Sequence, residues 1–389
     1  MTPATSSTTL AELRDREFAA VTSRGAYLNS ASTGPQPASA RRALEEAKRD
    51  RGDPVRWTVE RANATLDRSR ALAAQLIGAD ADEIALMPNT TTGINVAAWA
   101  LPLERGDVIL TFDREFPTNI YPWLARGRDG VVLERIPVTE NGWPDEARLM
   151  ARLGEPRVRG VCVSLTQFST GYTVDLEALS RATRATGTWL IVDAIQGMGQ
   201  VPVDVRRTPV DFLASGAQKW LLSPWGTGFL HVRRELIGAI HPTFAGWAAF
   251  RGTDDYSQLT AYDPEPWPDA RRFEVYTLPV QDFVAMNAAL ELLLDVGVPV
   301  IAAHARAITA PLRDAASQGA VRITSPGDRH GSAIVCVRSR RDTARGHARL
   351  VAAGVSCSLR EGSIRLAPHL FNTEDELAMV ADLLADAAR

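Results

Sequence analysis

Cysteine is scarce in this chain of 389 residues, and its three cysteines stand far apart at Cys162, Cys336 and Cys357. An odd, sparse set argues against a disulfide framework and predicts a reducing, cytoplasmic location. No stretch is apolar for long enough to cross a bilayer. The first nine residues are rich in serine and threonine and have no apolar core, so they lack the features of a secretory signal.

Charge and metal-binding patterns are also weak. The formal net charge of −3 gives no electrostatic argument for nucleic acid or an anionic membrane as a partner. The six histidines show no spacing typical of a metal site. The chain has neither a Gly-x-Gly-x-x-Gly after a predicted strand nor a Gly-Lys-Ser/Thr phosphate loop, so dinucleotide and nucleoside triphosphate sites lose their main support.

What the chain does have is an alternation of predicted strands and helices through its middle. This alternation is typical of an α/β fold with a mostly parallel central sheet flanked by helices. Helical patterns cover residues 145–153 and 175–186. The predicted strands are residues 107–112, 131–137, 158–165, 189–193, 210–214 and 228–232.

The last third of the chain predicts a smaller α+β domain. Residues 252–271, rich in proline, aspartate and aromatic residues, interrupt the alternation and mark an excursion or a boundary. We expect an N-terminal helical arm at 1–28, a large domain at 29–270 and a small domain at 271–389, with a helix leading in from the large domain. Its helices are predicted at 280–294, 300–317, 344–353 and 374–388, and its strands at 321–324, 333–337 and 355–365.

Lys219 carries the strongest chemical implication. The chain uses arginine almost everywhere else, and Lys219 follows the apolar stretch 210–214 within Ser215-Gly216-Ala217-Gln218-Lys219-Trp220. A lysine at the end of a buried strand, in a turn of small residues, is what Schiff-base chemistry requires, because burial lowers the pKa of the amine and leaves a neutral nucleophile. The alternative is an ordinary exposed lysine in a loop.

Asp193 ends the apolar run 189–192 at the carboxyl edge of a predicted strand, the side on which open α/β sheets bind ligands. An unpaired buried carboxylate is costly, so Asp193 should face a cation or a strong donor. A protonated pyridine nitrogen would serve, because a charged ring accepts electrons from a carbanion. Gln196 could then reach the ring oxygen. The alternative is that Asp193 only caps the following turn.

Two further motifs could bind anions. The run Asn89-Thr90-Thr91-Thr92-Gly93 precedes an apolar stretch and predicts a helix N-terminus, whose amides and hydroxyls form a seat for phosphate. Many helices begin this way without binding phosphate. Arg365, in a predicted strand of the small domain, is suited to bidentate capture of a carboxylate, although a surface salt bridge is an equal alternative.

Taken together, these motifs resemble the class V aminotransferase family of fold-type-I pyridoxal phosphate enzymes, in the branch of cysteine desulfurase, selenocysteine lyase, kynureninase and isopenicillin N epimerase. The resemblance runs from Tyr27-Leu28-Asn29-Ser30-Ala31-Ser32 to Arg365-Leu366-Ala367-Pro368-His369 and depends on the order and spacing of the motifs. It implies the fold-type-I architecture, pyridoxal 5′-phosphate bound by the large domain, a small amino-acid substrate, and a homodimer with composite active sites.

The resemblance also implies roles for individual residues. Lys219 would form the Schiff base, and Asp193 would pair with the pyridinium nitrogen. Arg365 would bind the substrate carboxylate, and the loop with Ala31 and Ser32 would line the substrate pocket. The other cofactor contacts would be Thr90 and Thr91 at the phosphate, Gln196 at the ring oxygen, Phe116 on the ring face, Gln218 beside the lysine, and Thr277, which would reach the phosphate from the neighbouring subunit.

Three positions are less clear in the resemblance. Either Gln167 or Ser169 would contact the cofactor. Gly216 stands where many relatives have a phosphate-binding serine, so that contact is missing or moves to Ser215. Desulfurases carry a nucleophilic cysteine on a mobile loop well before the carboxylate-binding arginine. Cys357 lies only eight residues before the arginine, in an alternating run, so we expect a half-buried strand thiol and no persulfide-forming nucleophile.

These residues predict an enzyme that breaks a bond at the Cα of an amino acid. We expect a lyase that eliminates across a C–S or other bond to Cβ, because such an elimination needs no dedicated thiol. An aminotransferase is the first alternative and an epimerase the second, since the same residues serve all three reactions. A non-catalytic, ligand-binding member of the fold is a further hypothesis, and the joint presence of Lys219, Asp193 and Arg365 argues against it.

Overall fold

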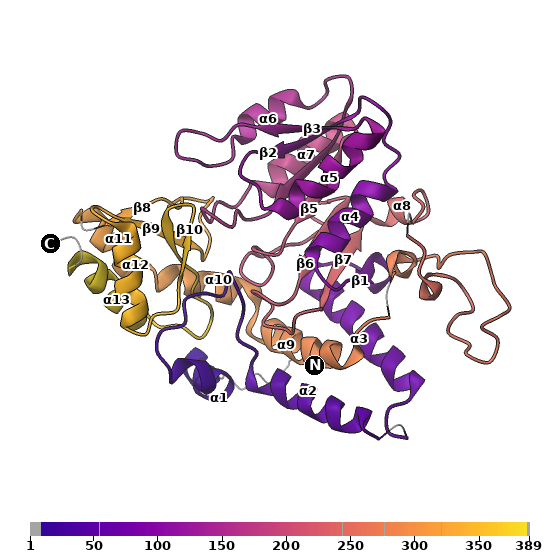
Figure 1. Cartoon of the computed structure of the whole chain (residues 1–389), viewed down its shortest axis with the longest axis horizontal. Helices are drawn as coiled ribbons and strands as arrows, with labels where there is room; N and C mark the ends of the chain where they lie inside the picture. Colours follow the sequence, from indigo (N-terminus) through magenta and orange to yellow (C-terminus); the bar gives the residue numbers. More distant parts are fainter. Residues whose placement is uncertain (1–8, 54, 243, 276, 320, 387–389) are drawn as a thin grey trace.

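The computed structural model describes residues 9–53, 55–242, 244–275, 277–319 and 321–386. These residues form two β-sheets with helices around them (Figure 1). The smaller sheet lies on the left of Figure 1, close to α11 (Ala310–Ser317), α12 (Thr343–Ala352) and α13 (Glu374–Asp386). The larger sheet lies on the right with most of the remaining helices.

The larger sheet has the strand order β1-β7-β6-β5-β4-β2-β3. Neighbouring strands are parallel except around β7, which is antiparallel to both β1 and β6. This confirms the mostly parallel sheet predicted from the sequence, although the short β1 was not predicted. The strands are β1 Ile84–Leu86, β2 Val108–Phe112, β3 Val132–Ile136, β4 Val158–Ser164, β5 Trp189–Asp193, β6 Phe212–Gly216 and β7 Gly228–Val232.

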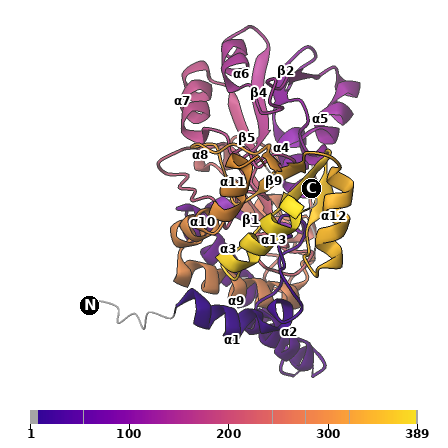
Figure 2. The ribbon, with the colours of Figure 1, turned by 90° about the vertical axis from the view of Figure 1, so that its left-hand side faces the viewer.

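Helices cover both faces of this sheet, as Figure 2 shows for α6 and α7 on one side of the strands and α5 on the other. Alternate side chains of β5 therefore enter two different cores: Leu190 and Val192 enter one, and Ile191 enters the other. Burial on both faces explains why the strands have continuous apolar sequences. The helices on this sheet are α4 Thr90–Ala100, α5 Tyr121–Arg126, α6 Glu146–Arg152, α7 Leu176–Thr186 and α8 Arg234–Ile237.

The smaller sheet is antiparallel, with the order β10-β11-β9-β8. Its strands are β8 Val321–Ile323, β9 Val335–Ser339, β10 Ser358–Arg360 and β11 Ser363–Leu366. The single strand predicted at 355–365 was wrong, because the chain turns back within it. Glu361 and Gly362 both have positive φ, 46° and 74°, which gives the two-residue turn that suits a twisted hairpin.

The helix predicted at 300–317 was also wrong as one element. It is divided into α10 (Val298–Ala307) and α11, and Pro311 lies in the first turn of α11. Proline lacks the amide that a continuous helix needs but fits the start of a new one. The other predicted helices agree with α9 (Val280–Val296), α12 and α13 to within a few residues, and the predicted residues 387 and 388 lie outside the described ones.

No single helix of the described residues is long and apolar enough to cross a membrane. Only α9 together with the following segment Val298–Ser317 meets those criteria as a pair, and the two are bent by 72° at the break between them. The excursion predicted at 252–271 is confirmed as a long irregular loop, on the right of Figure 1, that ends in the short 3-10 helix η5 (Ala270–Phe273).

The N-terminal arm contains α1 (Leu10–Thr22), which begins with a capping box between Thr9 and Glu12. It is followed by α2 (Ala38–Arg51) and α3 (Val59–Ile77), both of which pack on α9. Between α1 and α2 the chain pairs with the region of the small sheet, through bridges from Tyr27 to Ser356 and from Asn29 to Ala367. The domain bounds at 28/29 and 270/271 stay predictions.

Candidate active site

The predicted site residues come from the carboxyl ends of neighbouring strands. Ser164 at the end of β4 pairs in register with Asp193 at the end of β5, and Asp193 pairs with Ala214 near the end of β6. Lys219 follows β6 in the next turn. Because the carboxyl ends of parallel strands meet at one edge of a sheet, this edge gathers the acid and the amine.

Lys219 is partly buried in a turn that another segment holds closely. The backbone amide of Gly34 donates to the carbonyl of Gln218 at 2.9 Å, and a Cβ on Gly34 would lie 1.9 Å from the carbonyl oxygen of Lys219. Only glycine fits at position 34 without moving that turn. Burial lowers the pKa of Lys219 to about 8, with Asp193 acting in the opposite direction and Arg365 adding to the effect of burial.

Asp193 is 2% exposed, and its Oδ1 accepts a hydrogen bond from the backbone amide of Ile195 at 3.0 Å. With this one contact Asp193 caps the turn that follows it, as the alternative interpretation of the sequence expects. Burial raises the pKa of Asp193 to about 7, and the nearby Glu115 raises it further, while the amide of Ile195 and the charge of Lys219 lower it. No arginine, lysine or histidine of the described residues forms an ion pair with Asp193.

The two groups influence each other electrostatically, yet they form no ion pair with each other among the described contacts. A ligand with a cationic heterocycle would pair with the buried acid, which has no cation. An aldehyde on the same ligand would react with the amine, which has no hydrogen-bonding partner. Two buried atoms of neighbouring side chains, Gln218 Oε1 and Arg365 Nε, also lack hydrogen-bonding partners. These residues fit pyridoxal 5′-phosphate, because the bound group would complete partners that the protein leaves open.

The predicted helix N-terminus is confirmed as the start of α4. Asn89 is the N-cap, and its Oδ1 accepts from the amide of Thr92 at 2.9 Å. The hydroxyl of Thr90 accepts from the amide of Gly216 at 2.8 Å, which ties the helix start to the end of β6. The hydroxyls of Thr91 and Thr118 are 2.9 Å apart. Both predicted phosphate contacts therefore lie at this helix end, next to the turn that leads to the lysine.

Phe116 lies above the amine, with Lys219 Nζ 5.5 Å from its ring centroid. Its ring also meets Phe168 edge to face, with the centroids 5.3 Å apart. Phe116 remains 39% exposed, which is unusual for phenylalanine at the edge of a core. The structure therefore brings this ring close to the amine of Lys219, and its role on the face of the cofactor stays a prediction.

The two predicted glutamines differ in how they are held. Gln196 donates from Nε2 to the carbonyl of Ala31 at 2.9 Å and accepts at Oε1 from the indole of Trp220 at 2.9 Å. It links the predicted substrate loop to the residue after Lys219. The side-chain oxygen of Gln218 has no partner, and a Cβ on Gly216 would lie 2.5 Å from it. The predicted contact of Gln196 with a ring oxygen stays a prediction.

The predicted carboxylate-binding residues also lie together. Arg365 of β11 is 2% exposed, donates from Nη2 to the hydroxyl of Ser32 at 2.7 Å, and donates from Nη1 to the carbonyl of Phe168 at 2.9 Å. Burial lowers its pKa to about 10, and the nearby Arg360 adds to this effect. Ala31 is buried beside Ser32. A buried guanidinium without a carboxylate partner is suited to an acidic ligand group.

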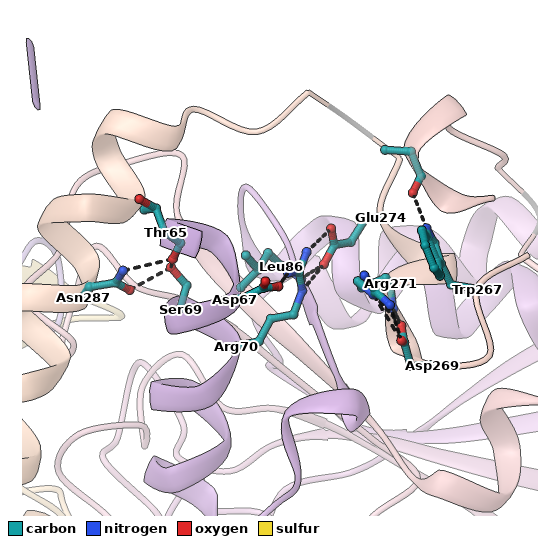
Figure 3. A network of polar contacts seen from close by, with 11 residues as sticks. Thr65, Asp67, Ser69, Arg70, Leu86, Trp267, Asp269, Arg271, Glu274 and Asn287 are labelled. Atoms are coloured by element: carbon teal, nitrogen blue, oxygen red, sulfur yellow. Dashed lines mark hydrogen bonds and ion pairs between the residues drawn. The ribbon is translucent and has the colours of Figure 1, made fainter. Parts of the chain in front are cut away.

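Thr277 is the predicted residue that the described contacts do not bring to Lys219. It is exposed and lines a hollow of about 270 Å³ on another part of the surface, beside the network drawn in Figure 3. In that network Arg70 donates to both carboxylate oxygens of Glu274, at 3.0 and 2.8 Å, and Glu274 also accepts from the amide of Leu86. The chain before Thr277 is thus anchored to α3 and β1.

Glu115, which directly precedes Phe116, was not identified from the sequence. This buried carboxylate accepts four hydrogen bonds, and one of them comes from Gln167 Nε2 at 2.7 Å. The side chain of Gln167 is thus held by Glu115, whereas Ser169 lines a different hollow of about 300 Å³. The open choice between Gln167 and Ser169 as a cofactor contact stays open. Ser215 donates its hydroxyl to the carbonyl of Gly216, so its predicted substitute role also stays a prediction.

The three cysteines are unsuited to nucleophilic attack. Cys162 and Cys336 are fully buried, and burial raises both pKa values, that of Cys336 to about 11. Cys357 lies just before β10, is partly buried against the core of the small domain, and has its pKa raised by burial to about 11. The half-buried thiol is confirmed, but the prediction that it lies in a strand was wrong, because β10 begins only at the next residue. Among the described residues, no three His, Cys, Asp or Glu side chains cluster as metal ligands would.

Comparisons with known proteins agree with this geometry. Residues 26–372 match the family model described as aminotransferase class-V. The chain is 31% identical to the protein named uncharacterized aminotransferase YcbU of Bacillus subtilis, over 80% of this chain and 81% of that one. It is 28% identical to a probable cysteine desulfurase of Methanothermobacter thermautotrophicus (93% and 94% covered) and 28% identical to isopenicillin N epimerase of Streptomyces clavuligerus (92% and 93%).

Among solved structures, the apo cysteine desulfurase of Thermococcus onnurineus has the same fold, with a TM-score of 0.86 at 20% identity over 98% of this chain and 99% of that one. The match to the family model covers most of the chain and includes every predicted site residue. The chain therefore belongs to the class V aminotransferase family and is an enzyme with pyridoxal 5′-phosphate as its cofactor.

Proposed function

We propose that this enzyme is a lyase that cleaves a C–S bond, or another bond to Cβ, of a small amino acid by β-elimination. The proposal is based on two side chains that influence each other electrostatically. Among the described residues, the amine of Lys219 has no hydrogen-bonding partner, and the buried guanidinium of Arg365 has no carboxylate partner. Such a pair can hold an α-carboxylate and remove the neighbouring α-proton. No described thiol is placed to take part.

In this proposal the bound cofactor supplies an aldehyde that links to amines and a ring that accepts electrons. Arg365 binds the α-carboxylate of the substrate, with Ser32 orienting one arm of the guanidinium. Lys219 takes the proton from Cα, because an amine with a pKa of about 8 is partly neutral near pH 7. Asp193 holds the proton on the ring nitrogen. The leaving group then departs from Cβ with its bonding electron pair.

Phe116 and the start of α4 complete the proposed site. Phe116 packs on the face of the ring, on the side where its own ring approaches Lys219. Thr90 and Thr91 bind the phosphate together with the amides at the N-terminus of α4, where the helix dipole favours negative charge. Gln218 and Gln196 make further contacts to the cofactor.

A desulfurase that forms a persulfide on its own cysteine is less well supported. The thiolate is the reactive form, and such cysteines are accessible and have lowered pKa values. Cys357 has a raised pKa and packs against the core of the small domain. An elimination that releases the sulfur-containing group directly needs no such residue.

We also propose a homodimer with composite active sites. Thr91 and Asn95 of α4 line a hollow of about 400 Å³ together with Phe244, which is 52% exposed. Trp247 begins the short 3-10 helix Trp247–Ala249 and is 49% exposed, and Tyr262 in the loop after that helix is 83% exposed. Large apolar surface next to a binding site is typical of a contact with another chain. A second copy that covers this region would bring its Thr277 to the phosphate. The cytoplasmic location stays a prediction.

The alternative functions use the same residues. An aminotransferase is favoured by the relative of that name in Bacillus subtilis, and an epimerase by the relative in Streptomyces clavuligerus. In an aminotransferase Lys219 would return the proton to the cofactor side, and in an epimerase a second group would deliver it to the opposite face of Cα. We assign proton transfer at Cα to Lys219 alone among the described residues.

A product assay separates these reactions. Purified holoenzyme is incubated with single amino acids, with L-cysteine and L-cystine among them, and products are followed with and without an added keto acid. A lyase releases ammonia and a keto acid without any acceptor. A reaction that stops after one turnover unless a keto acid is present would overturn the lyase in favour of the aminotransferase. Conversion to the mirror-image amino acid without release of ammonia would favour the epimerase.

The attachment of the cofactor can be tested in the same preparation. The protein should be yellow, and borohydride should bleach the visible band and fix the cofactor to one peptide. The chain has only two lysines, Lys48 and Lys219, and Lys48 is exposed on α2. The Lys48→Ala variant should keep the label and the Lys219→Ala variant should lose it. A protein that never acquires the band after reconstitution would favour the non-catalytic hypothesis.

A further inference from the structure

Glu115 lies between β2 and the short 3-10 helix η2 (Pro117–Asn119) and is buried. Its carboxylate accepts from the backbone amide of Ser164 at 3.0 Å and from the hydroxyl of Ser164 at 2.5 Å. It also accepts from Asn119 Nδ2 at 3.0 Å and Gln167 Nε2 at 2.7 Å. Each oxygen receives two hydrogen bonds, which is the arrangement expected for an ionised carboxylate.

These four bonds join residues 115–119 to residues 164–167, and both stretches carry or contact proposed active-site residues. Glu115 precedes Phe116, so the carboxylate fixes the backbone from which that ring reaches toward Lys219. Ser164 ends β4 and pairs in register with Asp193. Gln167 precedes Phe168, whose carbonyl accepts from Arg365.

The charge of Glu115 is not balanced by the protein. Among the described residues no lysine, arginine or histidine forms an ion pair with it, and its charge acts on Asp193, another acid. Burial raises the pKa of Glu115, while Ser164, Asn119 and Gln167 oppose that effect. The same carboxylate contributes to the raised pKa values of Asp193 and Cys162. Two buried acids that repel each other are costly unless a cation compensates them.

We propose that Glu115 is a positioning residue of this active site: its carboxylate ties the segment that carries Phe116 to the segment that pairs with Asp193 and accepts from Arg365, and its charge favours a cation at Asp193. The inference rests on the proposed function, because it assumes that the cofactor's ring nitrogen lies at Asp193. Glu115 itself touches neither the amine nor any of the proposed ligand groups among the described contacts, so it acts through the residues that it holds.

The Glu115→Gln variant tests this role. It keeps the size of the side chain but removes the charge, and its NH₂ group faces donors such as Asn119 Nδ2. We expect the KM for the amino-acid substrate to rise about tenfold with a smaller change in kcat. The reason is that the carbonyl of Phe168, which accepts a hydrogen bond from Arg365, is no longer held in a fixed position. We expect the pH midpoint of the cofactor's visible band to fall by about one unit, because a nearby negative charge is lost.

Glu146→Gln is the matched control. Glu146 of α6 is also a buried acid, and it accepts from the hydroxyl of Tyr172 at 2.8 Å and from the amide of Asp175 at 3.1 Å, away from the site. Its variant should lose thermal stability but keep the wild-type KM and the wild-type pH midpoint. Ser164→Ala provides a milder test, because it removes one hydrogen bond from Glu115 and keeps the charge. It should raise KM by a smaller factor than Glu115→Gln and leave the pH midpoint unchanged, because the negative charge stays.

The outcomes are distinct. If Glu115→Gln does not fold, Ser164→Ala carries the test alone. If the Glu115 or Ser164 variants differ from wild type only in thermal stability, as Glu146→Gln does, the positioning role is wrong while the proposed function stands. If the wild-type protein shows no visible band with the cofactor, the proposed function fails and Glu115 loses its role with it.

Discussion

Two buried polar clusters at different places around the larger sheet differ in whether their charged side chains form ion pairs. In the cluster of Figure 3, Arg70 is paired with Glu274 through two hydrogen bonds, and Asp67 adds a third contact to the same guanidinium. At the carboxyl edge of the sheet, Asp193 and Glu115 are buried and form no ion pair with any described cation. We call the first the paired cluster and the second the open cluster.

The difference indicates what each cluster is for. A buried ion pair with all its donors satisfied fixes two segments of chain, here the helix α3 and the stretch before α9. A buried acid near a partner-free amine costs stability and is retained where a ligand completes it. The open cluster therefore functions only with a bound group, whereas the paired cluster is complete within the protein.

The largest expected effect comes from removing the amine of the open cluster. Lys219→Ala should lower turnover by a factor of about 10³ or more, because both the attachment of the cofactor and the proton transfer at Cα are lost. The protein should remain folded, since Lys219 has no described hydrogen-bonding partner whose loss would be felt. Steady-state kinetics and a thermal unfolding curve measure the two effects. Undiminished turnover would remove the lysine from the mechanism.

The paired cluster should respond in stability instead. Arg70→Met leaves Glu274 buried without its cation and should lower the free energy of unfolding by about 3–5 kcal/mol. Arg68→Met on the same helix is the control, because its ion pair with Glu291 is exposed, with side-chain exposures of 54% and 46%. That control should change stability by less than about 1 kcal/mol. Denaturant unfolding measures both, and equal losses would mean that burial does not matter here.

The open cluster could be predicted from the sequence in part, because its main residues follow recognisable strands. Asp193 ends a run of four apolar residues, and Lys219 follows another apolar stretch, so the α/β pattern alone places both at one edge of the sheet. The helix start at Asn89 was recognisable from its capping residues. The roles of Phe116, Gln196 and Thr277 came only from the resemblance to a family.

Glu115 and the paired cluster could not be predicted, because their partners are distant in sequence. Glu115 is bonded to Ser164, 49 residues away, and Arg70 to Glu274, 204 residues away. Local patterns give no sign of such contacts, and an acid in a loop is expected to be exposed. The hairpin turn at Glu361 could not be predicted either, because the alternation of apolar and polar residues continues through the turn and resembles one strand.

Asp193→Asn should have a smaller effect, measured on the protein without cofactor. The folded pKa of Asp193, about 7, lies above the value near 3.9 of an unfolded aspartate, so folding takes up a proton between these pH values. Its contribution to stability is therefore full below about pH 4 and is lost as the pH rises through 7. The asparagine variant lacks this loss. It should be more stable than wild type at pH 8, by on the order of 2 kcal/mol, and equal to it near pH 4.

Denaturant unfolding of the wild type and the Asp193→Asn variant at pH 4 and pH 8 measures this difference in stability. Lys219 and Glu115, the charged groups that act on Asp193, are unchanged in both proteins. A variant less stable than wild type at pH 8 would show that the acid is compensated after all, and the open cluster would then be another paired one.

Cys357→Ser should have the smallest effect, and it decides whether the open cluster is sufficient for the chemistry. The thiol lies in neither cluster, packs beside the small sheet and has a pKa raised to about 11, so less than about one molecule in a thousand carries the thiolate at pH 7. Turnover should remain within about twofold of wild type, because elimination requires only the amine, the guanidinium and the bound cofactor. Release of sulfide from L-cysteine measures it. A loss of most of the activity would mean that a thiol outside both clusters carries the sulfur, and would replace direct elimination by persulfide formation.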